Sequence, residues 1–315
     1  MSAPTSVPPT VRPDREPDVP AAAAPKDAGP SPAAPERAAA RPPLSAARRR
    51  LVQAGWATTS LAVLVIGFGA FLPTLSGLQE QHAQAAAYKT LRERFGTAVA
   101  PTGPTVDGAP VAVIDIPALG LYQTVVVEGT TGRDLMRGPG HRRDTVLPGQ
   151  QGVSVLFGRR VSFGAPFARI AELHEGDRID VTTGQGKSSY VVNEHGEGGD
   201  PLTDQAENRL VLVTGDSDWI SSSTVMVGAR LLGEPYADAG TRGALRPTDK
   251  ALAADRSALS ALQLWTLGLL GCVTLTTLAV RLWHRWAAYL CSAPVLGAVL
   301  WSCYENAAAL LPNLY

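Results

Sequence analysis

The sequence is poor in cysteine, and its central part has none. Only three cysteines occur in 315 residues, Cys272, Cys291 and Cys303, and all of them fall in apolar windows toward the C-terminal end. A thiolate is the nucleophile of cysteine enzymes, and structural zinc sites are commonly built from several thiolates. The region before Cys272 therefore holds no disulfide, no cysteine nucleophile and no cysteine-based metal site.

The sequence also lacks an excess of charge of either sign. It has 28 Lys and Arg residues and 28 Asp and Glu residues, so its formal net charge is zero. This balance gives no overall electrostatic reason to expect a nucleic acid as partner. We expect no nucleic-acid partner, no metal and no other cofactor.

Residues 1–50 have few large apolar side chains. Residues 1–45 contain 12 of the 25 prolines, together with runs of alanine. Such a composition cannot bury enough apolar surface to offset the entropy lost on ordering the chain. We predict a disordered tail over 1–50 that acts as a spacer. A docking tail that binds through polyproline stretches is the alternative.

A long uncharged run follows the cluster of Arg48, Arg49 and Arg50, and the next charged residue is Glu80. About 20 apolar residues in a helix span the hydrocarbon core of a membrane. We therefore predict a transmembrane helix over 51–77. A cleaved signal peptide is disfavoured because the tail precedes the run and no small-residue cleavage site follows it. The arginines place the tail in the cytoplasm and the chain after this helix outside.

Two more apolar windows close the sequence. They predict transmembrane helices over 261–281 and 286–304, joined by a short loop with Arg281 and Arg285. With the first helix, they return this basic loop to the cytoplasm, where positive charge is favoured. The last window contains Pro294. A full span with the C-terminus outside is favoured, and a re-entrant hairpin that leaves it inside stays open.

The region between the first and second apolar windows has a different pattern. Residues 78–110 indicate a helical extension, with Tyr88, Leu91 and Phe95 on one face, followed by a linker rich in Pro and Gly. Residues 234–260 indicate an Ala-rich linker that becomes helical near its end.

Short runs typical of β-strands occur over 111–233, separated by Gly, Pro and Asp clusters. They favour a mainly β fold, a sandwich or a closed barrel. Two helical signals interrupt the runs, at 132–136 and 165–173. The runs cover residues 111–116, 122–127, 152–157, 178–182, 188–192, 209–213 and 224–231.

Several punctuated motifs follow one another in this region. They are Ile116 to Tyr122, Gly138-Pro139-Gly140-His141, Pro148-Gly149 with Gly152, Gly164-Ala165-Pro166-Phe167 and Leu173 to Asp177. In this order and spacing they resemble the sortase family, especially its class E type. The resemblance covers about 111–232 and implies a closed eight-stranded barrel with short helices, a transpeptidase activity and a Gram-positive, actinobacterial source.

The resemblance also implies a catalytic cysteine, histidine and arginine. Here the histidine position reads Arg159, the nucleophile position Gly215 and the oxyanion arginine position Thr224. Arginine stays protonated and cannot act as a base, and glycine has no side chain that could attack. No local shift of the alignment supplies a nucleophile, because no cysteine precedes Cys272. We therefore expect a pseudo-sortase in which the three degenerate positions still lie close together.

Four residues are candidates for binding in the former substrate groove: Arg159, Arg160, Asp216 and His141. We expect Arg159 to close the groove through an ion pair with Asp216. The alternative is that Arg159 presents its cation to an acidic partner. His141 is expected to make a structural hydrogen bond.

The sequence favours a catalytically inactive, membrane-anchored protein that acts as a binding or scaffold module at the cell surface. Two alternatives stay open. One is an active sortase with non-standard catalytic residues that anchors proteins to the cell wall, and the other is a subunit of a membrane protein complex. The expected partners are the membrane and a membrane or cell-surface protein or peptide. The expected location is the plasma membrane, crossed several times, with the barrel outside.

Overall fold

The computed structural model describes residues 46–97, 99–198, 202–204, 206–217, 221–282 and 285–315. The predicted tail lies outside these residues, except that helix α1 (Ala46–Phe71) already begins within it. The chain divides into two units after Gly55, and the features described below belong to the second unit, residues 56–315.

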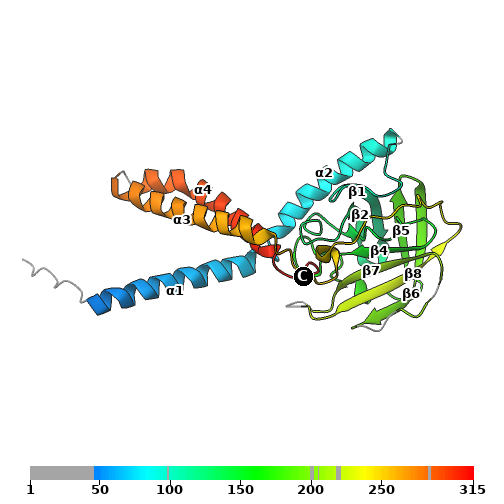
Figure 1. Ribbon diagram of the computed structural model, residues 1–315, viewed down its shortest axis with the longest axis horizontal. Helices are drawn as coiled ribbons and strands as arrows, with labels where there is room; N and C mark the ends of the chain where they lie inside the picture. The colour runs from blue at the N-terminus through cyan, green and yellow to red at the C-terminus, as the bar shows by residue number, and fades with distance from the viewer. Residues whose placement is uncertain (1–45, 98, 199–201, 205, 218–220, 283–284) are drawn as a thin grey trace, which may run out of the picture. The chain divides into compact units, whose positions relative to one another are not determined.

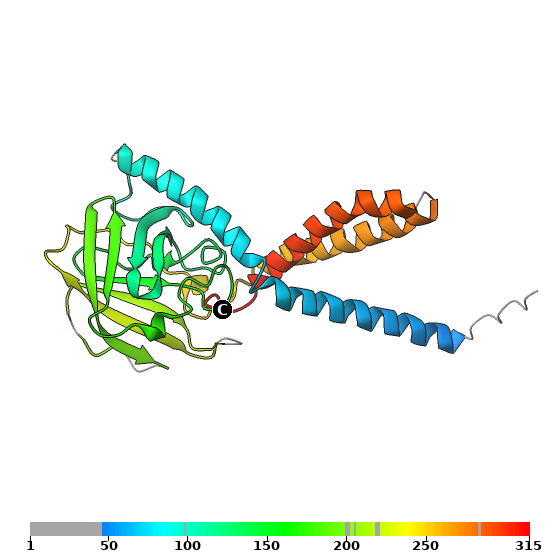
Figure 2. The ribbon, with the colours of Figure 1, turned by 180° about the vertical axis from the view of Figure 1, so that it is seen from behind.

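Three helices are long and apolar enough to cross a membrane, as predicted: α1, α3 (Ala258–Leu282) and α4 (Arg285–Ala308). Helices α3 and α4 lie side by side as a hairpin (Figures 1 and 2). The first helix is shorter than predicted at its C-terminal end, because a turn over 72–75 with Pro73 separates α1 from α2 (Ser76–Gly96). Proline lacks the N–H that would continue the helical hydrogen bonds.

An apolar cluster joins these helices to the barrel region. Its buried members include Phe71 at the end of α1, Ala258 at the start of α3 and Ala308 at the end of α4. They pack with Met136 and Phe163, which belong to loops of the barrel region. One end of each candidate span therefore meets the barrel region.

Eight strands form a closed barrel in the order β1-β2-β3-β4-β7-β8-β6-β5, which confirms the predicted fold class. Two neighbouring pairs, β2–β3 and β4–β7, are parallel, and the others are antiparallel. The strands are β1 (Pro110–Ile116), β2 (Leu121–Glu128), β3 (Gly140–His141), β4 (Val153–Phe157), β5 (Arg178–Thr183), β6 (Gly186–Glu197), β7 (Arg209–Gly215) and β8 (Thr224–Leu232).

Strand β7 is buried on both faces. Leu210 and Leu212 belong to the main core inside the barrel, whereas Val211 and Val213 belong to a second cluster. Successive side chains of a strand point to opposite faces, so the second cluster lies on the outer face of this wall. Burial on both sides explains why the strand is an uninterrupted apolar run rather than an alternating one.

Helix α2 packs against strands β1 and β2. Leu91 is fully buried with Val113 and Val125, and Tyr88 and Phe95 pack beside it, as the predicted apolar face requires. Figure 2 shows this helix along the barrel wall. The extension of the anchor is thus fixed to the barrel.

The two helical signals inside the barrel region are largely wrong. Residues 132–136 form turns, and within 165–173 only a single 3-10 turn, η2 (Ile170–Glu172), is helical. An α-helix cannot start at residue 165, because Phe163, Gly164 and Ala165 all have positive φ, between 44° and 74°.

The linker was predicted over 234–260; residues 234–257 of it run along the barrel, and α3 begins at Ala258. The N–H of Tyr236 donates to the carbonyl of Gly149, at 2.8 Å, and the Gln151 N–H donates to the Tyr236 carbonyl, at 3.0 Å. Further along, the short 3-10 turn η3 (Pro247–Asp249) buries the Asp249 side chain. This segment therefore supplies part of the polar network described below.

Candidate functional site at the ends of strands β4, β7 and β8

The three degenerate positions lie at the ends of adjacent strands. Gly215 of β7 is the direct partner of Thr224 of β8. Strands β4 and β7 pair up to Phe157 and Val213, and Arg159 follows that last pair by two residues. The pairing explains how residues far apart in sequence reach one end of the barrel wall. That they replace catalytic groups stays a prediction.

The Arg159 side chain is fully buried in a cage of oxygen acceptors. One guanidinium nitrogen donates to the Gly132 carbonyl at 2.8 Å. The other donates to the main-chain oxygen of Tyr315 and to the Ser162 hydroxyl, both at 3.1 Å. The Phe163 ring lies beneath the cation, 4.9 Å from its central carbon.

The prediction that Asp216 pairs with Arg159 is wrong. The Asp216 carboxylate instead accepts hydrogen bonds from the Ser223 hydroxyl at 2.7 Å and the Ser222 N–H at 3.1 Å. The bond from Ser223 contributes most to lowering the pKa of Asp216. Short polar side chains commonly bond to nearby groups in turns, and here Asp216 bonds to two residues of its own turn and not to Arg159.

No Asp or Glu carboxylate pairs with Arg159 among the residues that the structure describes. Burial lowers the pKa of the Arg159 guanidinium to about 9, so the group remains a cation at pH 7. A buried cation is costly unless hydrogen bonds replace its water shell. Here main-chain and hydroxyl oxygens do so at the two terminal nitrogens, whereas Nε has no hydrogen-bond partner among the described residues. The group is held as a donor, not as a base.

Gly215 lies where a side chain would have little room. A β-carbon at this position would lie 2.7 Å from that of Ser221 and 3.6 Å from the Leu314 carbonyl oxygen. The Ser221 hydroxyl donates to the Ser217 carbonyl at 3.1 Å. Ser221 therefore occupies the space that a nucleophile at residue 215 would need.

The terminal segment, residues 309–315, was not predicted to belong to the site. Leu314 is fully buried against the outer cluster of β4 and β7, with Phe157 and Val213 among its neighbours. Its carbonyl accepts from the Arg160 N–H at 3.0 Å. The Ser162 hydroxyl donates to the main-chain oxygen of Tyr315 at 2.6 Å. One sequence signal could have indicated this segment: several leucines follow the last predicted span, 286–304, and lie outside it.

Asn313 anchors the same segment. Its side chain is fully buried, and its amide nitrogen donates to the carbonyls of Thr130 at 2.8 Å and Lys250 at 2.9 Å. Its own N–H donates to the Ala253 carbonyl, also at 2.9 Å. The terminal segment is thus bound by the loop between β2 and β3 and by the segment 234–257 that follows β8.

The loop over residues 162–165 is strained. Phe163 and Ala165 have φ of 52° and 44°, a conformation that costs non-glycine residues roughly 1 kcal/mol each. Ser76 of α2 accepts the Phe163 N–H at 2.8 Å, and Ser162 bonds to the terminal segment. Such strain persists only where surrounding contacts hold it, and it often accompanies functional sites.

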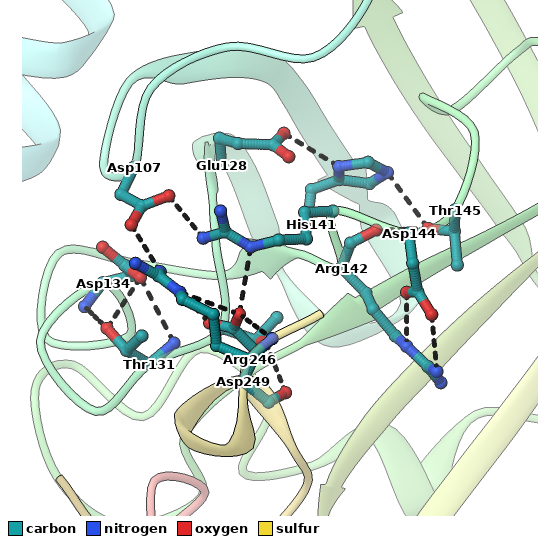
Figure 3. Close-up of polar contacts among 12 residues, drawn as sticks. Asp107, Glu128, Thr131, Asp134, His141, Arg142, Asp144, Thr145, Arg246 and Asp249 are labelled. Atoms are coloured by element: carbon teal, nitrogen blue, oxygen red, sulfur yellow. Dashed lines mark hydrogen bonds and ion pairs between the residues drawn. The ribbon is translucent and has the colours of Figure 1, made fainter. Parts of the chain in front are cut away.

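His141 makes structural hydrogen bonds, as predicted, and only 2% of it is exposed. Its Nδ1 lies 2.9 Å from a Glu128 carboxylate oxygen, and its Nε2 lies 2.8 Å from the Val146 carbonyl (Figure 3). A carbonyl can only accept, so Nε2 is the donor toward Val146. A residue so enclosed cannot contact a partner in the groove.

A second polar cluster lies beside this pair (Figure 3). The buried Asp249 carboxylate lies 3.0 Å from Nε of Arg143 and 3.3 Å from Nε of Arg246. Both arginines also pair with Asp107. Partial burial acts to raise the pKa of Asp107, but the hydrogen bonds from the two arginines outweigh it and hold the pKa below its usual range.

The described residues contain no group of three or more His, Cys, Asp or Glu side chains arranged to hold a metal ion.

Comparisons with known proteins agree with the motifs. The family model described as "Sortase domain" matches residues 114–231. Sortase D of Bacillus subtilis is 32% identical over 85 residues, which cover 27% of this chain and 41% of that protein. The match therefore spans less than half of this relative.

Similar solved structures include sortase E from Streptomyces avermitilis, 30% identical, which covers 45% of this chain and 100% of that one with a TM-score of 0.36. Another is a Clostridium perfringens Sortase D5 transpeptidase, 24% identical, covering 48% and 99% with a TM-score of 0.41.

Proposed function

The chain carries a sortase-family domain over residues 114–231, and from this premise we propose that it is a membrane-anchored module that binds a cell-surface protein or peptide without processing it. In this role the barrel acts as a binding or scaffold unit. The strand ends that would carry a catalytic centre serve binding and structure instead.

One observation carries this proposal: the group at the end of β4 is a fully buried arginine that donates to main-chain oxygens. A general base must be able to accept a proton from the reacting group, and a protonated guanidinium cannot. The adjacent strand offers Gly215 where a nucleophile would stand, with Ser221 filling the space. The sequence has no cysteine before Cys272.

The hydroxyls around Gly215 do not replace the missing nucleophile. Thr214 is fully buried and donates to the Gly158 carbonyl at 2.8 Å. Ser162 and Ser221 donate to carbonyl oxygens in the same way. A hydroxyl becomes a nucleophile when a base takes its proton, and these three protons are committed to carbonyls.

We further propose that the barrel is extracytoplasmic and that the 1–50 tail is cytoplasmic. The ends of α1 and α4 and the start of α3 share one apolar cluster with barrel loops. Arg48, Arg49, Arg50 and Arg281 lie toward the opposite ends of these helices. Positive charge favours the cytoplasmic side.

Single cysteines test this topology in a chain whose three native cysteines are serines. A membrane-impermeant maleimide should label Asp177→Cys in intact cells and Arg50→Cys only after permeabilisation. Labelling of position 50 with protection of position 177 would reverse the assignment.

Turnover of a fluorescent sorting-signal peptide tests the lack of catalysis. The purified full-length chain should neither cleave the peptide nor transfer it to an amine nucleophile above the buffer rate. An active sortase assayed in the same detergent is the positive control. Product formation by the wild-type chain would refute the proposal.

A further inference from the structure

The terminal segment contacts the barrel as a bound peptide would. Three successive residues use their main chains: the Asn313 N–H donates to Ala253, the Leu314 carbonyl accepts from Arg160, and the Tyr315 oxygen accepts from Arg159. The segment lies in none of the eight strands of the barrel. It could therefore leave without breaking a strand pair.

We propose that residues 309–315 act as an intramolecular ligand of the outer face of β4 and β7, a surface called the cleft below, and that they block it against other extended peptides. Another extended peptide then binds only after this segment has left. The inference does not depend on the absence of catalysis, because it concerns occupancy of the cleft and not turnover.

Two side chains give the cleft its selectivity. Leu314 is fully buried in the outer apolar cluster, which suits a branched aliphatic side chain. Asn313 places an amide donor between the carbonyls of Thr130 and Lys250. A carboxylate in that place would face two acceptors with no proton to offer, so the site favours a donor over an acid.

Release of the segment would change the environment of Arg159. The guanidinium would lose the Tyr315 oxygen and keep the bonds to Gly132 and Ser162. The freed N–H would then point at the emptied cleft. The ligand class is therefore an extended peptide that offers a main-chain oxygen to this cation and an aliphatic side chain to the apolar cluster.

The segment also links the cleft to the membrane. It follows α4 directly, and Ala308 and Ala309 are both buried in the cluster where the helices join the barrel. A shift of α4 would pull on the segment at its N-terminal end. Occupancy of the cleft is thereby coupled to the packing of the last span.

Asn313→Asp in the full-length chain tests the proposal, because it keeps the shape of the side chain and removes its donor. The matched control is Asn306→Asp on α4, which accepts from Arg133 and lies outside the cleft. Hydrogen exchange of the Arg160 amide, which donates to Leu314, should be at least tenfold faster in Asn313→Asp than in the control or the wild type. Exchange in β5 and β6 should not change.

A labelled peptide with the native sequence of residues 309–315 supplies the second measurement. Fluorescence anisotropy should show it binding to Asn313→Asp at least tenfold more tightly than to the wild type or to Asn306→Asp. A chain that lacks residues 310–315 should bind it as well.

Unchanged Arg160 exchange together with equal peptide binding in all variants would overturn the proposal. Loss of protection throughout the barrel in Asn313→Asp would also overturn it, since the segment would then be part of the folded core and not a ligand.

Discussion

Arg159 and Arg143 are both largely enclosed, but their surroundings differ. Arg143 is 12% exposed and faces two carboxylates, from Asp107 and Asp249. Arg159 is fully buried, and its partners are the main-chain oxygens of Gly132 and Tyr315 and the Ser162 hydroxyl. Aspartate side chains pair with Arg143, whereas no Asp or Glu side chain pairs with Arg159 among the described residues.

The difference between the two arginines shows where, in the part of the chain that the structure describes, charged side chains of this barrel are buried without a partner of opposite charge. The Glu80 side chain of α2 lies against Gly164, the residue that follows Phe163, whose ring contacts Arg159. Burial raises the pKa of Glu80 to about 7. Among the described residues, Glu80 and Arg159 therefore contact the same strained loop without an oppositely charged side chain as partner, whereas Asp249 pairs with two arginines.

The largest effect should come from breaking the paired region. Asp249→Asn removes the negative charge shared by Arg143 and Arg246, and loss of one partner from a buried ion pair typically costs about 3–5 kcal/mol. Denaturant unfolding of the full-length chain in detergent measures the loss. Asp238→Asn, at a surface pair with Arg242, should change stability little. Equal effects of the two changes would contradict this account.

A smaller effect should follow at Arg159. Arg159→Met leaves carbonyl acceptors without donors but also removes a charge that must be desolvated. We expect a loss of about 1–3 kcal/mol, less than for Asp249→Asn. The same unfolding measurement applies, with the exposed Arg178→Met on β5 as control. A loss larger than that of Asp249→Asn would mean that the carbonyl cage holds the barrel together more than the ion pairs do.

Glu80 makes stability depend on pH. The folded-state pKa of Glu80, about 7, lies above its ordinary value of 4.5, so the folded state keeps a proton that the unfolded state has lost. This contribution is complete below pH 4.5 and is lost as pH rises to about 7.

Glu80→Gln should remove the loss of stability that the wild type suffers as pH rises, because glutamine does not ionise. The variant should match the wild type at pH 4.5 and be more stable by about 1–2 kcal/mol at pH 8, a figure reduced because the Glu80 side chain is only partly buried. Thermal unfolding at the two pH values measures the difference. Glu93→Gln, further along α2, is the control. An equal gain at both pH values would show that packing, not charge, is responsible.

The smallest expected change is in activity. Gly215→Cys supplies a thiol but no base, because the neighbouring Arg159 stays protonated. Turnover of a sorting-signal peptide should remain at the buffer rate, while a thiol reagent confirms that the new cysteine is present. Thr224→Cys, on the strand opposite, controls for thiol placement. Turnover by Gly215→Cys alone would show that Arg159 does not prevent catalysis.

Much of this protein follows from the sequence by itself. Span length and apolar composition predict three helices long and apolar enough to cross a membrane, and short punctuated β-type runs predict the barrel, because both depend on local patterns of residues. The order of the motifs places Arg159, Gly215 and Thr224 at strand ends, and strand pairing then makes Gly215 the partner of Thr224. The sequence also shows directly which side chains are lacking: no cysteine precedes Cys272.

Only the tertiary structure decided which groups satisfy the buried cation. Asp216 is near Gly215 in sequence and carries the right charge, yet its carboxylate bonds within its own turn. The oxygen of Tyr315, 156 residues from Arg159, takes its place. Main-chain acceptors are the same for every residue type, so no sequence pattern marks them. Their positions depend on how the terminal segment and the loops pack, which is a property of the folded chain.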